Sequence, residues 1–511
     1  MSVGSLASSI QPASTGLQTP SGTRELGLRR VLTVFSVVAA LGVVAHFGVL
    51  LWGQNEFSQP ESVVAAQSMM LAHDGTFYTS LRDYPYTVNA YMPTFYLLDA
   101  GLIRLGVAPF IAGRLISFTA LLGIFAVCWR LLKLYSGSQY CAWVGTLLCA
   151  STSVLLSWGT VGQVDTLAVF FGLTAFYHYA RHRCGQQRAL ILAGVFVVLA
   201  VFTKQTMLAA PTAIFVCLLV DNWKRALTFG LSVAGIALAG VAGLNLWTHG
   251  NFLLNTVFAN MNPFVFEKFN QHLNYMLIAA GQLILAVAIC ARATWSGHGK
   301  TLLVYLGFAA AVLAVTAPKL GSDSNYQMET TIVLALSAAL GVHAMGYFKH
   351  LFQGNRTWIT LLHLPLAIHM VLNFRITFPF LIARVVKEQM FRQQVASLRP
   401  WVPTSGRVLS TDLNAMVRLR GRLDVEPLIY TLLVHAGRID PKPLQLDLEA
   451  AAFPIVIMYW DLSKPFDHDP ELPVLPDAQM DEIRKHYRLV QHFPGPYQDG
   501  VYVYQPIERS L

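Results

Sequence analysis

Three charged side chains lie where apolar segments begin or break, and their types could do chemistry. Glu61 follows Pro60 at the start of PESVVAAQSMMLAHDG, Asp165 opens an apolar run in SWGTVGQVDTLAVFF, and Lys204 interrupts AGVFVVLAVFTKQTMLAAP. A carboxylate can take a proton from a hydroxyl or an amine. An ammonium group beside an apolar helix can bind the phosphate of a lipid. These residues therefore predict a base and a cation for a phosphate.

Each of the three also has a structural alternative. Glu61 suits the first turn of a helix, whose dipole favours an acid there, and the sequence alone favours this reading. Asp165 could cap its helix, which is compatible with a catalytic role. Lys204 could extend to the membrane interface, but its place at the break between two short helices favours a function.

A second polar group precedes a later apolar run, in APKLGSDSNYQMETT. Asn325 and Glu329 would lie on one face of a helix that begins there, with Tyr326 between them. These side chains could bind sugar hydroxyls, or they could form a turn and an N-cap.

Aromatic residues are concentrated in YPYTVNAYMPTFY, where Tyr84 and Tyr91 could form a platform for a sugar or an isoprenoid. An interfacial aromatic belt is the alternative. Gln205, next to Lys204, is a further candidate for substrate binding.

The composition describes a protein of many membrane spans. Of 511 residues, 54% are hydrophobic and only 12% are charged, where soluble proteins have about 25% charged residues. Apolar runs that span a membrane need about 20 residues. We place eleven, at 31–52, 112–134, 139–157, 165–182, 188–203, 208–223, 225–247, 276–294, 300–318, 328–346 and 357–373, and the runs at 188–203 and 208–223 are short enough to be broken helices.

Charge decides how the run at 91–108 lies. If it lies along the outer surface and the N-terminus is cytoplasmic, the cytoplasmic connections are basic, as the positive-inside rule requires. The formal net charge of +9 then reflects topology rather than a nucleic-acid surface. The first loop, Asp165, Lys204 and the segment around Asn325 all fall on the extracytoplasmic face, together with the C-terminus.

Three regions follow from this topology. Residues 1–30 are expected to be a disordered cytoplasmic tail, and 31–373 a transmembrane module whose first loop, 53–111, carries function. Residues 374–511 are expected to form an extracytoplasmic α/β domain, with strand-like runs (RVLSTD, FPIVIMYWDL, GVYVYQPI) and helix-like runs (PLIYTLLVHAG, AQMDEIRKHYRLV). The fold class is thus a polytopic α-helical membrane protein with a small C-terminal α/β domain.

Several common sites are missing from the sequence. It has no Walker A loop, no GxSxG or GxGxxG motif, and no zinc-type Cys/His spacing. We therefore predict no cofactor and no metal-ligand cluster, although Glu61 and Asp165 could share a divalent cation in the fold.

The ordered set of motifs resembles GT-C glycosyltransferases that use polyprenyl-phosphate sugars, in particular protein O-mannosyltransferases and lipid A aminoarabinose transferases. The resemblance covers roughly residues 30–225 and is carried by Glu61, the YPYTVNAYMPTFYLLDAGLIRLG segment, AGRLISFTALLG, VGQVDTLAVFF and FTKQT. It implies a GT-C fold in a plasma membrane. It also implies inverting transfer from a polyprenyl-phosphate donor to a lipid, glycan or protein acceptor outside the cytoplasm.

The resemblance also implies roles for individual residues. Glu61 would be the base, Asp165 a second acid, Lys204 the ligand of the donor phosphate, and Arg114 a residue that holds the first loop or the donor. One departure matters, because many relatives have an Asp-Glu pair where this chain has Pro60 and Glu61. Glu61 or Glu56 would then be the base, or the chain would be inactive.

Two other functions compete with this one. A transporter or flippase for a lipid-linked saccharide would place polar residues deep in several spans or show inverted repeats, and neither is evident. A non-catalytic scaffold would leave the outer acids and Lys204 without a role.

Overall fold

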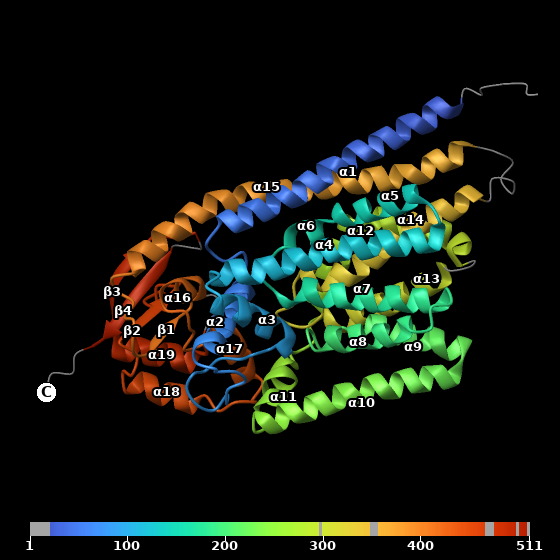
Figure 1. The fold of residues 1–511 in the computed structure, drawn as a ribbon. Helices are drawn as coiled ribbons and strands as arrows, with labels where there is room; N and C mark the ends of the chain where they lie inside the picture. Colours follow the sequence, from blue (N-terminus) through green and yellow to red (C-terminus); the bar gives the residue numbers. More distant parts are fainter. Residues whose placement is uncertain (1–20, 296–298, 348–355, 465–474, 497–499, 508–511) are drawn as a thin grey trace, which may run out of the picture.

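The computed structural model describes residues 21–295, 299–347, 356–464, 475–496 and 500–507. It is a helical bundle with a small sheet at one end (Figure 1). Of the predicted N-terminal tail, residues 1–20 lie outside the described residues, and 21–30 already belong to helix α1. The helices up to residue 398 are α1 (Ser21–Trp52), α2 (Gln59–His73), α3 (Pro93–Arg104), α4 (Pro109–Ser136), α5 (Gln139–Ala150), α6 (Ser153–Trp158), α7 (Val164–Arg183), α8 (Ala189–Val201), α9 (Ala209–Asp221), α10 (Trp223–Trp247), α11 (Asn251–Thr256), η1 (Phe258–Asn260), α12 (Phe266–Trp295), α13 (Gly299–Thr316), η2 (Ser324–Gln327), α14 (Met328–Tyr347) and α15 (Arg356–Leu398).

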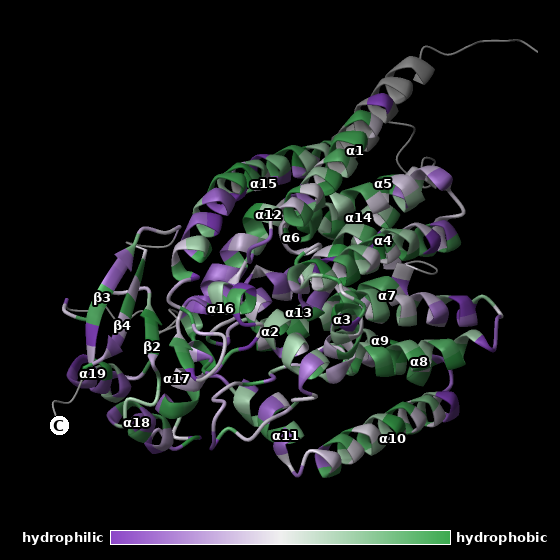
Figure 2. Cartoon of the chain, turned by 60° about the vertical axis from the view of Figure 1, so that its left-hand side comes forward, coloured by the Kyte–Doolittle hydropathy of each residue, from purple (hydrophilic) through white to green (hydrophobic). Residues whose placement is uncertain are grey.

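The helices confirm a multi-pass membrane protein. Each predicted apolar segment overlaps a helix, with α5 and α6 sharing the segment 139–157. Among the described residues, 6 helices are long and apolar enough to cross a membrane, and α8 and α9 are shorter apolar helices. Figure 2 shows the hydrophobic character of the bundle helices. The count of eleven spans stays a prediction.

The first loop folds into two short helices beside the bundle. Helix α3 has 12 residues, about 18 Å of helix, which is too short to cross a hydrocarbon layer of about 30 Å. Its buried Phe95 and Tyr96 pack with Val64 of α2 and Val164 of α7. The loop is therefore a folded layer on one end of the bundle.

Helix α15 is longer than predicted. The predicted span ends at 373, but the helix, which contains Pro365 and Pro379, continues to Leu398. Its later turns contain charged residues, so hydropathy falls while the helical pattern continues, with Phe391, Val395 and Leu398 buried. This extension carries the chain from the bundle to the C-terminal unit (Figure 1).

The C-terminal unit is a mixed sheet with short helices. The strands β1 (Val408–Ser410), β2 (Ile455–Met458), β3 (Tyr487–Phe493) and β4 (Val501–Pro506) have the order β1-β2-β4-β3, and only the β1–β2 pair is parallel. The strand-like runs become β1, β2 and β4. The predicted helix AQMDEIRKHYRLV is wrong in its last four residues, because α19 ends at His486 and the aromatic and branched residues that follow pair with β4. The helices here are α16 (Leu413–Leu419), α17 (Pro427–His435), α18 (Lys442–Glu449) and α19 (Asp477–His486).

The first loop and the C-terminal unit share a hydrophobic core. Ala65 and Ala66 of α2 pack with Val408, Leu413 and Met416 of the C-terminal unit. Tyr86 pairs with Val425 as an isolated parallel bridge. The C-terminal unit therefore rests on the same end of the bundle as the first loop (Figure 1).

Candidate functional site

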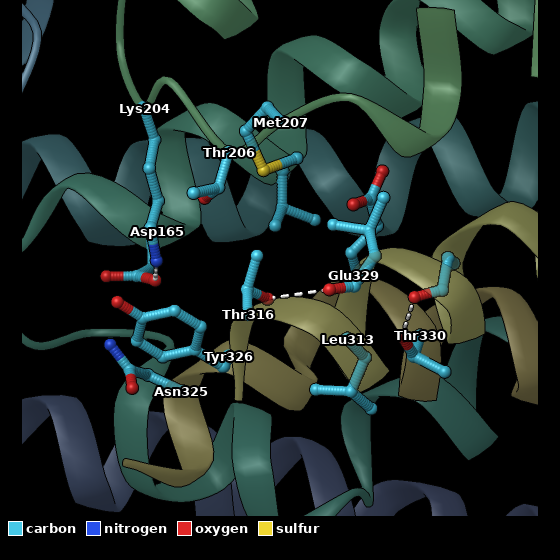
Figure 3. A pocket seen from close by; sticks show the side chains of 13 residues that line it. Asp165, Lys204, Thr206, Met207, Leu313, Thr316, Asn325, Tyr326, Glu329 and Thr330 are labelled. Carbon is cyan, nitrogen blue, oxygen red and sulfur yellow. Dashed lines mark hydrogen bonds and ion pairs between the residues drawn. The ribbon is translucent and has the colours of Figure 1, made fainter. Parts of the chain in front are cut away.

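Five of the predicted site residues contact or surround one small cavity (Figure 3). Asp165 comes from the first turn of α7, and Lys204 from the turn between α8 and α9. Asn325 and Tyr326 come from η2, and Glu329 from the first turn of α14. The cavity has a volume of about 30 Å³, which is room for about one water molecule.

An ion pair lies at the centre of this site. The Nζ atom of Lys204 is 2.6 Å from Oδ1 of Asp165, and both side chains are almost fully buried. Oδ2 of Asp165 has no hydrogen-bond partner among the described residues. The aromatic ring of Tyr326 lies 4.0 Å from the same Nζ atom. The site thus combines an ammonium group that is fixed by an ion pair with a carboxylate oxygen that has no hydrogen-bond partner among the described residues.

The turn that carries Lys204 is held by the first loop. The amide of Gln205 donates to the carbonyls of Ala90 (3.0 Å) and Thr256 (2.9 Å). The hydroxyl of Thr94 donates to the carbonyl of Phe202 at 2.7 Å. Gln205 is therefore a residue that fixes the turn, and its Nε2 atom is already occupied.

Tyr91 and Glu329 complete the polar surroundings. Burial, and after it the charges of Tyr326 and Asp165, raise the pKa of Tyr91 above its usual value. Glu329 accepts a hydrogen bond of 2.7 Å from the hydroxyl of Tyr305. These contacts support the expectation that the segment around Asn325 faces the same site.

Glu61 lies in a separate, closed arrangement. Its two oxygens accept from Nε (2.8 Å) and Nη2 (2.9 Å) of Arg114, and also from the backbone amides of Phe57 (2.6 Å) and Gly162 (2.9 Å). Burial by itself raises the pKa of Glu61, but Arg114 and the two amides outweigh burial, so the pKa lies below its usual value. Glu61 is thus poorly suited to take a proton or to share a cation with Asp165.

Arg114 extends this arrangement to the end of α1. The guanidinium donates to the carbonyls of Leu50, Gly53 (2.6 Å) and Asn55 (2.6 Å), and its side chain is fully buried. The Glu61–Arg114 pair therefore joins α1, the first loop and the turn before α7. The expectation that Arg114 holds the first loop agrees with these contacts.

Glu56 faces the C-terminal unit. Its carboxylate accepts from the hydroxyl of Ser62 at 2.5 Å, and its backbone amide donates to Asn414 at 3.0 Å. Burial raises the pKa of Glu56 to about 7. Glu56 does not line the Asp165–Lys204 cavity.

Tyr84 also lies away from the cavity. Its hydroxyl donates to Asp424, and its ring lies 4.3 Å from the guanidinium carbon of Arg407. These contacts place Tyr84 at the interface between the first loop and the C-terminal unit, and its substrate-binding role stays a prediction. Its partners follow more than 300 residues later in the chain, so sequence spacing gives no sign of them.

Nothing in the sequence indicates that the other residues around the cavity belong to a site. These residues include two threonines and two apolar residues, Thr206, Thr316, Met207 and Leu313. Within the described ranges, no three His, Cys, Asp or Glu side chains come together in a way that could hold a metal ion.

The chain is similar to known proteins both in part of its sequence and in its fold. Residues 28–259 match the family model described as dolichyl-phosphate-mannose-protein mannosyltransferase, and no curated protein matches the sequence. ArnT from Cupriavidus metallidurans, solved with undecaprenyl phosphate, has a TM-score of 0.61 at 12% identity, covering 95% of this chain and 98% of that chain.

Two further structures share the fold. Arabinofuranosyltransferase AftD from Mycobacteria has a TM-score of 0.51 at 15% identity, covering 94% of this chain and 40% of that chain. The oligosaccharyltransferase of Archaeoglobus fulgidus, solved with Zn and sulfate, has a TM-score of 0.50 at 12% identity, covering 92% of this chain and 73% of that chain. The family match covers residues 28–259, which is less than half of the 511 residues, and the solved structures show that the chain has a GT-C fold.

Proposed function

We propose that the chain transfers a sugar from polyprenyl phosphate to an acceptor on the extracytoplasmic face, at the Asp165–Lys204 cavity. One observation carries the proposal: a buried ammonium and a carboxylate with a free oxygen meet at 2.6 Å on the wall of a cavity. A buried ion pair is costly unless all its polar atoms have hydrogen-bond partners or the pair has a function. Oδ2 of Asp165 has no such partner among the described residues.

The reaction balances with these groups. The acceptor hydroxyl or amine attacks the anomeric carbon, and its proton passes to Oδ2 of Asp165. The bond between that carbon and the phosphate oxygen breaks, and polyprenyl phosphate leaves with the electron pair. Lys204 stabilises the charge that develops on the leaving phosphate. Attack opposite the leaving group inverts the anomeric configuration.

In this proposal Glu61 is a positioning residue rather than the base. Four donors already occupy its oxygens, so a proton from the acceptor has no free oxygen to reach. Asp165 lines the cavity and Glu61 does not. The loss of the Asp before Glu61, where Pro60 stands, is then compatible with activity.

Donor binding must enlarge the site. A cavity of about 30 Å³ is far smaller than a ligand pocket of about 300 Å³ or more. The ring of Tyr326 covers the ammonium of Lys204, so we propose that the phosphate displaces this ring. Asn325 and Tyr91 would then face the sugar.

The orientation of the chain supports this placement. Arg130, Lys133, Lys224 and Arg225 lie at helix ends opposite to the turn of Lys204. By the positive-inside rule these ends face the cytoplasm. The N-terminus would be cytoplasmic, and the cavity and the C-terminal unit would lie outside.

Purified protein in liposomes tests the function. A polyprenyl-phosphate sugar, labelled on the sugar, is supplied with candidate lipid, glycan and peptide acceptors. We expect label to leave the lipid, to appear on one acceptor class, and to have the opposite anomeric configuration. A sugar that crosses the bilayer while still attached to its lipid would contradict this function and support a transporter.

A further inference from the structure

A large groove lies between α8 and α10, away from the Asp165–Lys204 cavity. Its volume is about 700 Å³, and most of its wall is apolar, including Leu190, Val198, Phe229 and Val233. Helix α10 buries only Ala226 and Phe229 within the protein. Figure 2 shows α10 as hydrophobic along most of its length, on the outside of the bundle. The groove therefore opens toward lipid.

One end of this groove is strongly basic. Lys224 and Arg225 line it in the first turn of α10, and neither forms an ion pair with any described residue. Cations are unfavourable at a helix N-terminus, where the dipole and the free amide groups attract anions. The first turn of α10 thus combines two unpaired cations with a helix end that favours negative charge.

A buried histidine points to a ligand at the same end. His182, in the last turn of α7, lines the groove and is only 7% exposed, yet its Nδ1 atom has no hydrogen-bond partner among the described residues. Gln187 lines the groove beside it. A buried polar atom without a partner is costly, and a hydroxyl group of a glycerol headgroup, which can donate a hydrogen bond, would satisfy it.

We propose that this groove binds an anionic glycerophospholipid, with its phosphate at Lys224 and Arg225 and one acyl chain along α8. Helix α8 has 13 residues and is about 20 Å long, close to the depth of one leaflet. An acyl chain matches this length, whereas a polyprenyl chain exceeds it. The basic end of the groove, at Lys224 and Arg225, lies at the opposite end of α9 from Lys204, so the phosphate would bind far from the ion pair of the donor site.

Native mass spectrometry of the full chain tests the site. Wild-type protein is titrated with phosphatidylglycerol or phosphatidylcholine of the same acyl chains. The double variant Lys224→Ala/Arg225→Ala removes the cations, and Arg130→Ala/Lys133→Ala removes an equal number from the same face outside the groove. Ser232→Trp fills the groove and leaves its charge unchanged.

We expect Lys224→Ala/Arg225→Ala to bind phosphatidylglycerol about 30-fold more weakly. The variant should lose much less of its affinity for phosphatidylcholine, because the choline of that lipid already neutralises its phosphate. Ser232→Trp should weaken the binding of both lipids, and the control pair should change neither. Equal phosphatidylglycerol binding by wild type and Lys224→Ala/Arg225→Ala would overturn the proposal. An equal loss in the control pair would do the same, since it would indicate attraction to the whole basic face.

Discussion

The Asp165→Asn variant is expected to transfer sugar about 10²- to 10⁴-fold more slowly than wild type, which is the usual contribution of a general base. Asparagine keeps the shape of the side chain and can still accept a hydrogen bond from Lys204. It cannot take a proton from the acceptor. The rate is measured with labelled donor in liposomes and divided by the amount of folded protein.

A matched substitution controls for the loss of an acid near the site. Asp323→Asn changes an exposed aspartate that caps η2 and does not line the cavity, so its transfer rate should equal that of wild type. Asp165→Glu keeps the charge for Lys204 but moves the free oxygen, so it should fold normally and still lose most of its activity. Wild-type rates in both Asp165 variants would remove Asp165 as the base.

Arg114→Ala is expected to have the largest effect on folding. It leaves the carboxylate of Glu61 buried without its cation, a change that typically costs about 3–5 kcal/mol. It also removes the donor to the carbonyls of Leu50, Gly53 and Asn55. Thermal unfolding in detergent should show a large loss, and little folded protein should reach the membrane.

Arg104→Ala provides the comparison. Arg104 also donates to two carbonyls, those of Ala72 and Leu71, but it is exposed, so water can replace it at a cost of about 1 kcal/mol. Glu61→Gln should fall between the two, because its oxygen can still accept from Arg114. If Arg114→Ala unfolded at the same temperature as Arg104→Ala, the Glu61–Arg114 ion pair would not be what joins α1, the first loop and the turn before α7.

Hydropathy predicted most of the bundle, because each apolar run must form a helix in a membrane to satisfy its backbone. Hydropathy failed where a polar segment stays helical and where an apolar segment forms a strand. Helix α15 continues past Asn373 although charged residues enter it. The run after His486 is apolar and aromatic enough to pair as β3, and a single sequence does not show the strand that it joins.

Candidate residues could be chosen from the sequence, but their partners could not. Asp165 and Lys204 each drew attention as a charge at the edge of an apolar run, yet nothing in the sequence pairs residues 39 positions apart. Glu61 drew attention for the same reason. Its four donors come from three segments that only the fold brings together, and on these contacts we propose that it positions the first loop rather than acting as the base.

The most direct test of the transfer site is a structure of the Asp165→Asn variant with a bound polyprenyl-phosphate sugar. We predict that a phosphate oxygen lies about 2.7–2.9 Å from Nζ of Lys204, as charge-assisted hydrogen bonds require. The anomeric carbon should face residue 165, and the ring of Tyr326 should have moved. A phosphate bound elsewhere, with the Lys204–Tyr326 contact intact, would contradict this account.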